Sequence, residues 1–87
     1  MTLLFHKRVK KELKRLPKNK RKQFYENLLL FAMNPHHPLL GTHALHGKYV
    51  GYMSMNVDGD LRAVYEVLSG DVVRFVAIGT HHQLFGS

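Results

Sequence analysis

The feature that most constrains the fold of this chain is a β-hairpin signal within residues 49–67. Asp58 and Gly59 lie between two runs rich in valine, tyrosine and methionine. Asp-Gly between such runs is a strong short-range signal for a tight two-residue turn joining antiparallel strands. The sequence therefore predicts a hairpin whose turn sits at this dipeptide.

The predicted turn also assigns residues to the two faces of the hairpin. If Val57 pairs with Asp60, then Met55 lies opposite Arg62 and Met53 opposite Val64, because paired residues share a face and side chains alternate along a strand. Asp60 and Arg62 would then point together, toward solvent or a ligand. The other face is the expected core side and carries Tyr52, Ser54, Asn56, Leu61, Ala63, Tyr65 and Val67.

The residues before the hairpin predict a short strand and two helices. Residues 2–5 are apolar and tolerate a strand. Residues 6–16 place Val9, Leu13 and Leu16 at helical spacing, with lysines mostly on the far side. Pro17 favours a break and a restart, and a second helix with a wide apolar face is expected over residues 18–33. Residues 36–47 are expected to form a loop.

The residues after the hairpin complete the expected sheet. Ser69-Gly70-Asp71 predicts a turn, and residues 72–78 are almost continuously apolar, as in a strand within a sheet. Gly79 is expected to end that strand. The predicted fold class is α+β, with an N-terminal helical hairpin packed on a small, mainly antiparallel sheet. A chain of 87 residues favours a single domain over residues 1–87.

The charge distribution favours a polyanionic partner. The net charge is +7, and ten of the thirteen lysines and arginines lie between Lys7 and Lys22. Such an asymmetry is typical of chains that bind nucleic acid or an acidic protein segment. A solvated helix face that only keeps the domain soluble would show the same run, so composition alone leaves both open.

Other classes of protein are disfavoured by what the sequence omits. There is no cysteine, which excludes disulfides and thiolate metal sites and fits a reducing cytosol. No apolar run approaches the length of a membrane span, and the first residues lack the order of a signal peptide. We expect a cytoplasmic protein with no membrane segment and no small-molecule cofactor.

The seven histidines are the first candidates for chemistry, because the imidazole titrates near neutral pH. No two of them show helical i, i+4 ligand spacing, so no metal site is expected. Metal-free RNA cleavage needs a base, a cation and an acid, and His43, Arg62 with Asp60, and His81 are available for these roles. A loop histidine more often caps a turn, however, and Arg62 could simply pair with Glu66.

The segment HALHGKYVGYMSMNVDGDLRAVYEV, followed by FVAIGTHHQLFG, resembles the YafQ-type branch of the RelE/ParE superfamily of bacterial toxins from toxin-antitoxin pairs. Members typically show an HxLxGxxxGYR segment, a G-D-x-R-x-x-Y strand and a closing GTHxxLFG. The match covers residues 42–86, and the basic helical hairpin before it agrees in layout only.

The resemblance implies a small ribonuclease that cuts messenger RNA in the ribosomal A site and is silenced by a cognate antitoxin. It implies a general base at His43, a general acid at His81, an arginine on the scissile phosphate at Arg62 and an acidic residue at Asp60. RNA contacts are implied at further positions, which are Phe85 beneath a nucleobase, Lys48 on a backbone phosphate, and Lys10 and Lys14 on the basic helix.

The sequence departs from the family pattern at Met53, where relatives usually have arginine or lysine. We expect this change to weaken cleavage and Met53→Arg to raise it, because fewer cations would meet the charge of the transition state. Two alternatives stay open: a ParE-type toxin that inhibits DNA gyrase, and a catalytically weakened relative that only binds RNA or antitoxin.

Overall fold

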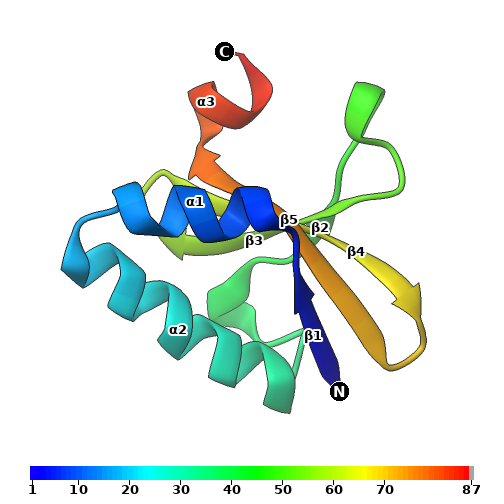
Figure 1. Cartoon of the computed structure of the whole chain (residues 1–87). Coiled ribbons are helices and arrows are strands. Elements are labelled where there is room, and N and C mark those ends of the chain that lie inside the picture. The colour runs from blue at the N-terminus through cyan, green and yellow to red at the C-terminus, as the bar shows by residue number, and fades with distance from the viewer. Residues whose placement is uncertain (87) are drawn as a thin grey trace.

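The computed structural model describes residues 1–86 and has the predicted α+β architecture, with two N-terminal helices packed on one sheet (Figure 1). The elements in chain order are β1 (Thr2–Phe5), α1 (Lys7–Arg15), α2 (Lys18–Met33), the 3-10 turn η1 (Pro38–Leu40), β2 (His43–Ala44), the 3-10 turn η2 (Gly47–Tyr49), β3 (Met53–Asp58), β4 (Leu61–Ser69), β5 (Val72–Thr80) and α3 (His81–Phe85).

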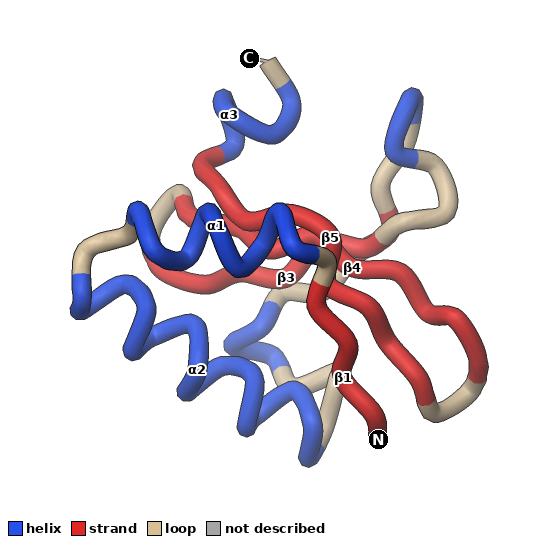
Figure 2. Tube along the Cα trace, in the orientation of Figure 1, coloured by secondary structure: helices blue, strands red, loops and turns tan. Residues whose placement is uncertain are grey.

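Within these residues the strands form a five-stranded sheet in the order β1-β5-β4-β3-β2. Only the pairing of β1 with β5 is parallel, and the other three pairings are antiparallel. Figure 2 shows α1 and α2 on one side of the sheet, while α3 and the η2 segment project from it elsewhere. No helix of the described residues is long and apolar enough to cross a membrane.

The helix α2 has the bounds that the sequence predicts, and α1 is one residue shorter at each end than the predicted 6–16. The Nδ1 atom of His6 accepts a hydrogen bond from the Arg8 backbone N–H and caps α1. Leu16 and Pro17 have extended backbone between the helices, because proline disfavours helical geometry in the residue before it. The apolar face of α2 is narrower than expected, since Phe24, Leu28 and Phe31 are buried but the neighbouring stripe is exposed.

The main core lies between the helices and the sheet. Phe75 of β5 is fully buried, and its ring contacts Phe24, Phe31 and Tyr65 with centroids 5.3–5.9 Å apart. Such edge-on and tilted contacts are favourable aromatic geometries. The same cluster includes Val9, Leu13, Leu28, Leu40, Met55, Val57, Leu61, Ala63, Val73 and Ile78.

The hairpin forms as predicted, but its register differs by one residue. Asp58 pairs with Leu61 across a turn at Gly59 and Asp60, and a bulge at Val57 separates this pair from Asn56 and its partner Arg62. Because side chains alternate along a strand, the shift reverses the predicted faces of β3. The prediction that Met53 and Met55 share a face with Arg62 is therefore wrong.

The C-terminal elements also correct the sequence prediction. Gly79 was expected to end the strand that begins at residue 72, but this strand, β5, continues to Thr80. The residues that follow form α3, which begins with a capping box between Thr80 and Gln83. The Thr80 side chain accepts from the Gln83 backbone N–H, and the Gln83 side chain accepts from the Thr80 backbone N–H.

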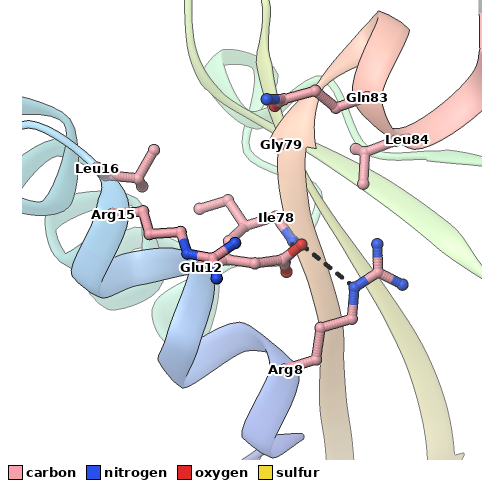
Figure 3. A pocket seen from close by; sticks show the side chains of 8 residues that line it. All are labelled: Arg8, Glu12, Arg15, Leu16, Ile78, Gly79, Gln83 and Leu84. Atoms are coloured by element: carbon pink, nitrogen blue, oxygen red, sulfur yellow. Dashed lines mark hydrogen bonds and ion pairs between the residues drawn. The ribbon is translucent and has the colours of Figure 1, made fainter.

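The end of β5 pairs with β4 on one edge, and on the other edge a side chain of α1 takes the place of a strand. The pairing of β1 with β5 stops at Phe75, so Ile78 and Thr80 lie beyond the end of β1. The Glu12 carboxylate of α1 accepts a hydrogen bond of 2.9 Å from the Ile78 backbone N–H. Figure 3 shows Glu12 beside Ile78, with Arg8 paired to the same carboxylate. The Glu12 carboxylate therefore takes the place of a strand on this edge of β5, close to the point where α3 begins.

Candidate active site

A small cleft is lined by residues of α3, of β2 and of the segment after β2, on the side of the sheet away from the main core. Figure 1 shows where α3 lies relative to the sheet. Its volume is about 160 Å³. The residues that line it come from five separate elements or loops and are His43, Leu45, His46, Ser54, Arg62, His81 and Phe85. The structure thus brings together His43, Arg62 and His81, which are far apart in the chain.

The sheet register explains why these residues meet. His43 of β2 pairs with Ser54 of β3, which pairs in turn with Val64 of β4. Arg62 lies two residues before Val64 and therefore on the same face. Leu61 pairs with Thr80, so the residue that follows, His81, is delivered to the same end of the sheet. Three strands and one helix start therefore converge on a single place.

The hydrogen bond of His43 assigns the proton of its neutral ring. Its Nδ1 atom lies 3.1 Å from the backbone oxygen of Gly41. A carbonyl oxygen only accepts, so Nδ1 carries the proton in this contact and Nε2 keeps its lone pair. The side chain is exposed. An exposed imidazole with an available Nε2 lone pair can act as a general base.

The short helix α3 carries the opposite wall of the cleft. His81 is its first residue and Phe85 its last, and their ring centroids lie 4.9 Å apart. Behind this pair, the Tyr49 ring meets Phe85 edge-on at 5.5 Å, and the Tyr49 hydroxyl donates to the Leu84 backbone oxygen. The 3-10 turn η2 and α3 therefore brace each other through Tyr49.

Arg62 does not pair with Glu66, the structural role that the sequence left open for it. Glu66 instead forms a 2.6 Å ion pair with Arg74. The Arg62 Nη1 atom donates to the backbone oxygens of Gly59 and Leu61 at 2.7 and 3.3 Å. No carboxylate of the described residues forms an ion pair with Arg62, so its charge can interact with an anion in the cleft.

Comparison with known proteins shows the family. The family model described as the bacterial toxin of a type II toxin-antitoxin system, YafQ, matches residues 1–86. The chain belongs to the YafQ family of toxins. It is thus a toxin of the RelE/ParE superfamily, as its sequence motifs indicate.

Solved structures agree with this assignment. YafQ from E. coli strain BL21(DE3) is 25% identical with a TM-score of 0.74, and the alignment covers 97% of each chain. The E. coli DinJ-YafQ complex matches at 26% identity and a TM-score of 0.71, again over 97% of both chains. The YoeB/ParE toxin from Agrobacterium tumefaciens shares the fold at 19% identity and a TM-score of 0.77, over 93% of this chain and 99% of that one. None of the curated proteins matches the chain.

Several residues predicted for the site of this YafQ-family toxin lie outside the cleft. Asp60 is exposed in the hairpin turn and is not among the residues that line the cleft. Lys48 lies on η2 with its ammonium 5.4 Å from the centre of the Tyr49 ring, facing a neighbouring groove. Lys10 and Lys14 are exposed on α1.

Met53 and Met55 also lie outside the cleft of this YafQ-family toxin, because the bulge at Val57 turns them to the other face of the sheet. Met55 is fully buried in the main core, and Met53 packs against that core from its edge. The prediction that Met53 takes the place of a catalytic cation is therefore not supported by its position. Tyr52, predicted to be core, lies half-buried on the cleft side of the sheet, where a hydrogen bond to Glu66 raises its pKa.

Sequence reasoning missed three residues of the cleft, which are Leu45, His46 and Ser54. A signal for Ser54 was present, because Met53, Met55 and Val57 alternate with Ser54 and Asn56. Apolar-polar alternation of this kind favours the methionines for the core and the polar residues for the other face. Among the described residues, no three histidine or acidic side chains lie close enough to hold a metal ion together.

Proposed function

We propose that this YafQ-family toxin is a metal-independent endoribonuclease that cuts messenger RNA in the ribosomal A site. The observation that carries the proposal is the convergence of His43, Arg62 and His81 on one cleft. A base, a cation and an acid around a space of this size are the groups that internal transfer at an RNA phosphate requires. A pure binding protein would not need that combination.

In the proposed reaction, His43 Nε2 takes the proton from a ribose 2′-OH. The 2′-oxygen attacks the adjacent phosphorus, the P–O5′ bond breaks, and His81 gives a proton to the departing 5′-oxygen. Arg62 stabilises the additional negative charge on the phosphorane-like transition state. The products are a 2′,3′-cyclic phosphate and a free 5′-hydroxyl, and each proton is accounted for.

Residues around the cleft supply RNA contacts in this proposal. Phe85 lines the cleft and presents a ring on which a nucleobase can stack. In this proposal Lys48 beside the cleft, and the exposed Lys10 and Lys14 on α1, contact backbone phosphates of messenger or ribosomal RNA. Because the substrate is a message on the ribosome, the proposed place of action is the cytoplasm.

The test is to translate a defined message with purified ribosomes and toxin and to map the cuts at codon resolution. We expect cuts within codons held in the A site, with unchanged cutting after chelation of free divalent ions beyond those that the ribosome needs. Arg62→Ala should reduce the cleavage rate by at least a hundredfold. Inhibition of DNA gyrase without any cut message would contradict the proposal, and so would full activity of the Arg62 variant.

We infer that the protein partner is a cognate antitoxin that covers an exposed stripe on α2. Tyr25, Leu29 and Met33 follow one another at i, i+4 and i+8, and Leu29 and Met33 are 71% and 85% exposed. Lys18 and Lys22 continue the same stripe toward the start of the helix. An amphipathic segment with acidic residues at one end would match both parts, and the related E. coli YafQ forms a complex with DinJ.

The antitoxin inference is tested by calorimetry with the cognate antitoxin. Leu29→Asp should weaken binding at least tenfold, because it places a charge in an apolar contact. Val50→Asp is the matched control, since Val50 is also exposed but directly follows η2 rather than lying on or beside α2. Equal affinity of the Leu29 variant and the wild type would show that the antitoxin binds elsewhere.

A further inference from the structure

Ser54 carries a buried hydroxyl group without a hydrogen-bond partner at the bottom of the cleft. The residue is 1% exposed and is the one polar side chain in the buried class among the described residues. Its Oγ atom has no hydrogen-bond partner within those residues. The same side chain lines the cleft that contains His43, Arg62 and His81.

An unpartnered buried hydroxyl lowers stability, because folding removes it from water and gives no bond in return. Ser54 is the second residue of β3 and is paired on both sides, where an alanine would satisfy the backbone pairing equally well. Its cross-strand neighbour on β4 is Val64, which offers no polar group. The fold therefore retains a hydroxyl that it does not itself use, at the place where a substrate would lie.

The register places this hydroxyl between the groups of the proposed reaction. Ser54 lies directly opposite His43, and directly paired residues of antiparallel strands have Cβ atoms roughly 4.5–5.5 Å apart. Arg62 lies on the next strand, diagonal to Ser54, where Cβ atoms are roughly 7–8 Å apart. A phosphate held by the Arg62 guanidinium and approached from His43 would come within reach of the Ser54 hydroxyl.

We propose that Ser54 is a further catalytic residue, whose hydroxyl donates a hydrogen bond to a non-bridging oxygen of the scissile RNA phosphate. This inference rests on the proposed function. Among the described residues that line the cleft, Arg62 is the one permanently charged cation, and the Ser54 hydroxyl supplies a second donor where negative charge develops. Ser54 exchanges no proton, since His43 and His81 already account for the two protons that move.

The first test compares Ser54→Ala with Ser69→Ala, which removes a hydroxyl at an exposed position at the end of β4. Ser54→Ala should lower the rate of ribosome-dependent cleavage about tenfold, with the change in kcat rather than in KM. Its melting temperature should stay the same or rise by a few degrees, because an unpaired polar group has been removed. Ser69→Ala should change neither quantity.

If Ser54 had a purely structural role, the expected effect of Ser54→Ala on the melting temperature would be the opposite. If Ser54→Ala lowered the melting temperature and the cleavage rate together, the loss of activity would follow from the loss of folded protein and the proposal would be overturned. A Ser54→Ala variant that cuts at the wild-type rate would overturn it as well. Lower activity in a variant of equal or higher stability supports the catalytic role.

The second test identifies the atom that receives the hydrogen bond. Messages are made with a single phosphorothioate of either configuration at the A-site phosphate, because sulfur accepts hydrogen bonds poorly. With one of the two diastereomers, wild type and Ser54→Ala should cut at similar rates, since the same bond is already lost. With ordinary phosphate the two should differ about tenfold. The same ratio on all three messages would refute the proposed contact.

The two levels of the proposal fail in different ways. If the wild-type toxin makes no cut on programmed ribosomes, the proposed function and the role of Ser54 both fall. If the wild type cuts, the Arg62 variant does not, and Ser54→Ala cuts as fast as wild type, the nuclease function stands and only the Ser54 contact is lost.

Discussion

The two faces of the sheet differ in what they bury and in what they expose. The helix-covered face holds the main core, including the ring cluster around Phe75. The core residues described on this face are all aliphatic or aromatic. The other face buries a smaller cluster of Val64, Ala77 and Leu84, and beside it lie the groups that can act on a substrate. The main core thus lies on one face of the sheet, and the candidate active site lies on the other.

The largest expected effect lies on the cleft face and concerns activity alone. His81→Ala should reduce the rate of message cleavage by 10²–10⁴-fold, which is the usual contribution of a general acid. His81 is exposed and lies outside both apolar clusters, so the melting temperature should not change. The paired measurement is the cleavage rate on programmed ribosomes and a thermal melt. Residual activity close to wild type would remove His81 from the mechanism.

The largest expected effect on the helix-covered face concerns stability. Phe75→Ala removes the ring that contacts Phe24, Phe31 and Tyr65, and burial of this kind is worth about 3–5 kcal/mol. That loss is comparable to the whole stability of many small domains. Denaturant unfolding should show it directly. A Phe75 variant with wild-type stability would break the division between the two faces.

Glu12 is expected to affect both faces at an intermediate level. Glu12→Ala leaves the buried Ile78 N–H without its acceptor, at a cost of about 1–3 kcal/mol. Because that bond holds the end of β5, from which His81 follows, cleavage should also fall. Glu26→Ala, an exposed carboxylate on α2, is the control. Loss of stability with full cleavage by the remaining folded protein would show that the two faces are not coupled here.

Met53→Arg sharpens the comparison because the sequence and the structure forecast different results. The family pattern predicts a gain of cleavage, whereas the position of Met53 at the edge of the main core predicts none. A charged side chain in this partly buried place should cost about 1–2 kcal/mol. The measurement is the cleavage rate together with urea unfolding. Faster cleavage would mean that position 53 reaches the substrate.

The smallest expected effect is a change in stability at alkaline pH. Burial raises the pKa of Tyr65 above its ordinary value of 10.0, although a hydrogen bond with Thr42 opposes the shift. Above pH 10 the unfolded chain loses this proton while the folded protein keeps it, so stability falls as the pH rises. Melts from about pH 9 to 11 should show a weaker decline for Tyr65→Phe. Tyr25→Phe, at an exposed position, should decline like wild type.

The sequence predicted the elements better than their register. Hydrophobic periodicity and Pro17 predicted the ends of both helices to within one residue, and the Asp-Gly signal located the hairpin. The bulge at Val57 has no sequence signature as specific as Asp-Gly, and one extra residue was enough to exchange the two faces of β3. The Thr80-to-Gln83 spacing signalled a helix start that the expected strand break at Gly79 concealed.

The family motifs named residues far apart in the chain that the structure brings to one cleft, whereas positions that depend on local geometry were misplaced. His43, Arg62, His81 and Phe85 line one cleft, as the motifs imply. The prediction put Asp60 on the same face as Arg62 because it assumed a turn at Asp58 and Gly59. In the structure the turn lies one residue later, and Asp60 is part of it. The same error assigned Ser54 to the core face. In the structure Ser54 is buried on the opposite face, at the bottom of the cleft.

The parallel pairing of β1 with β5 has a consequence for how the protein is made. β1 and both long helices leave the ribosome early, but the strand that carries Phe75 and leads into His81 is synthesised only after the hairpin. α1 packs on β5, and Phe75 of that strand contacts Phe24 and Phe31 of α2, so the core and the cleft are completed only when that strand arrives. We therefore expect a copy that stops before β5 to lack both the completed core and His81, and to be unable to cleave RNA.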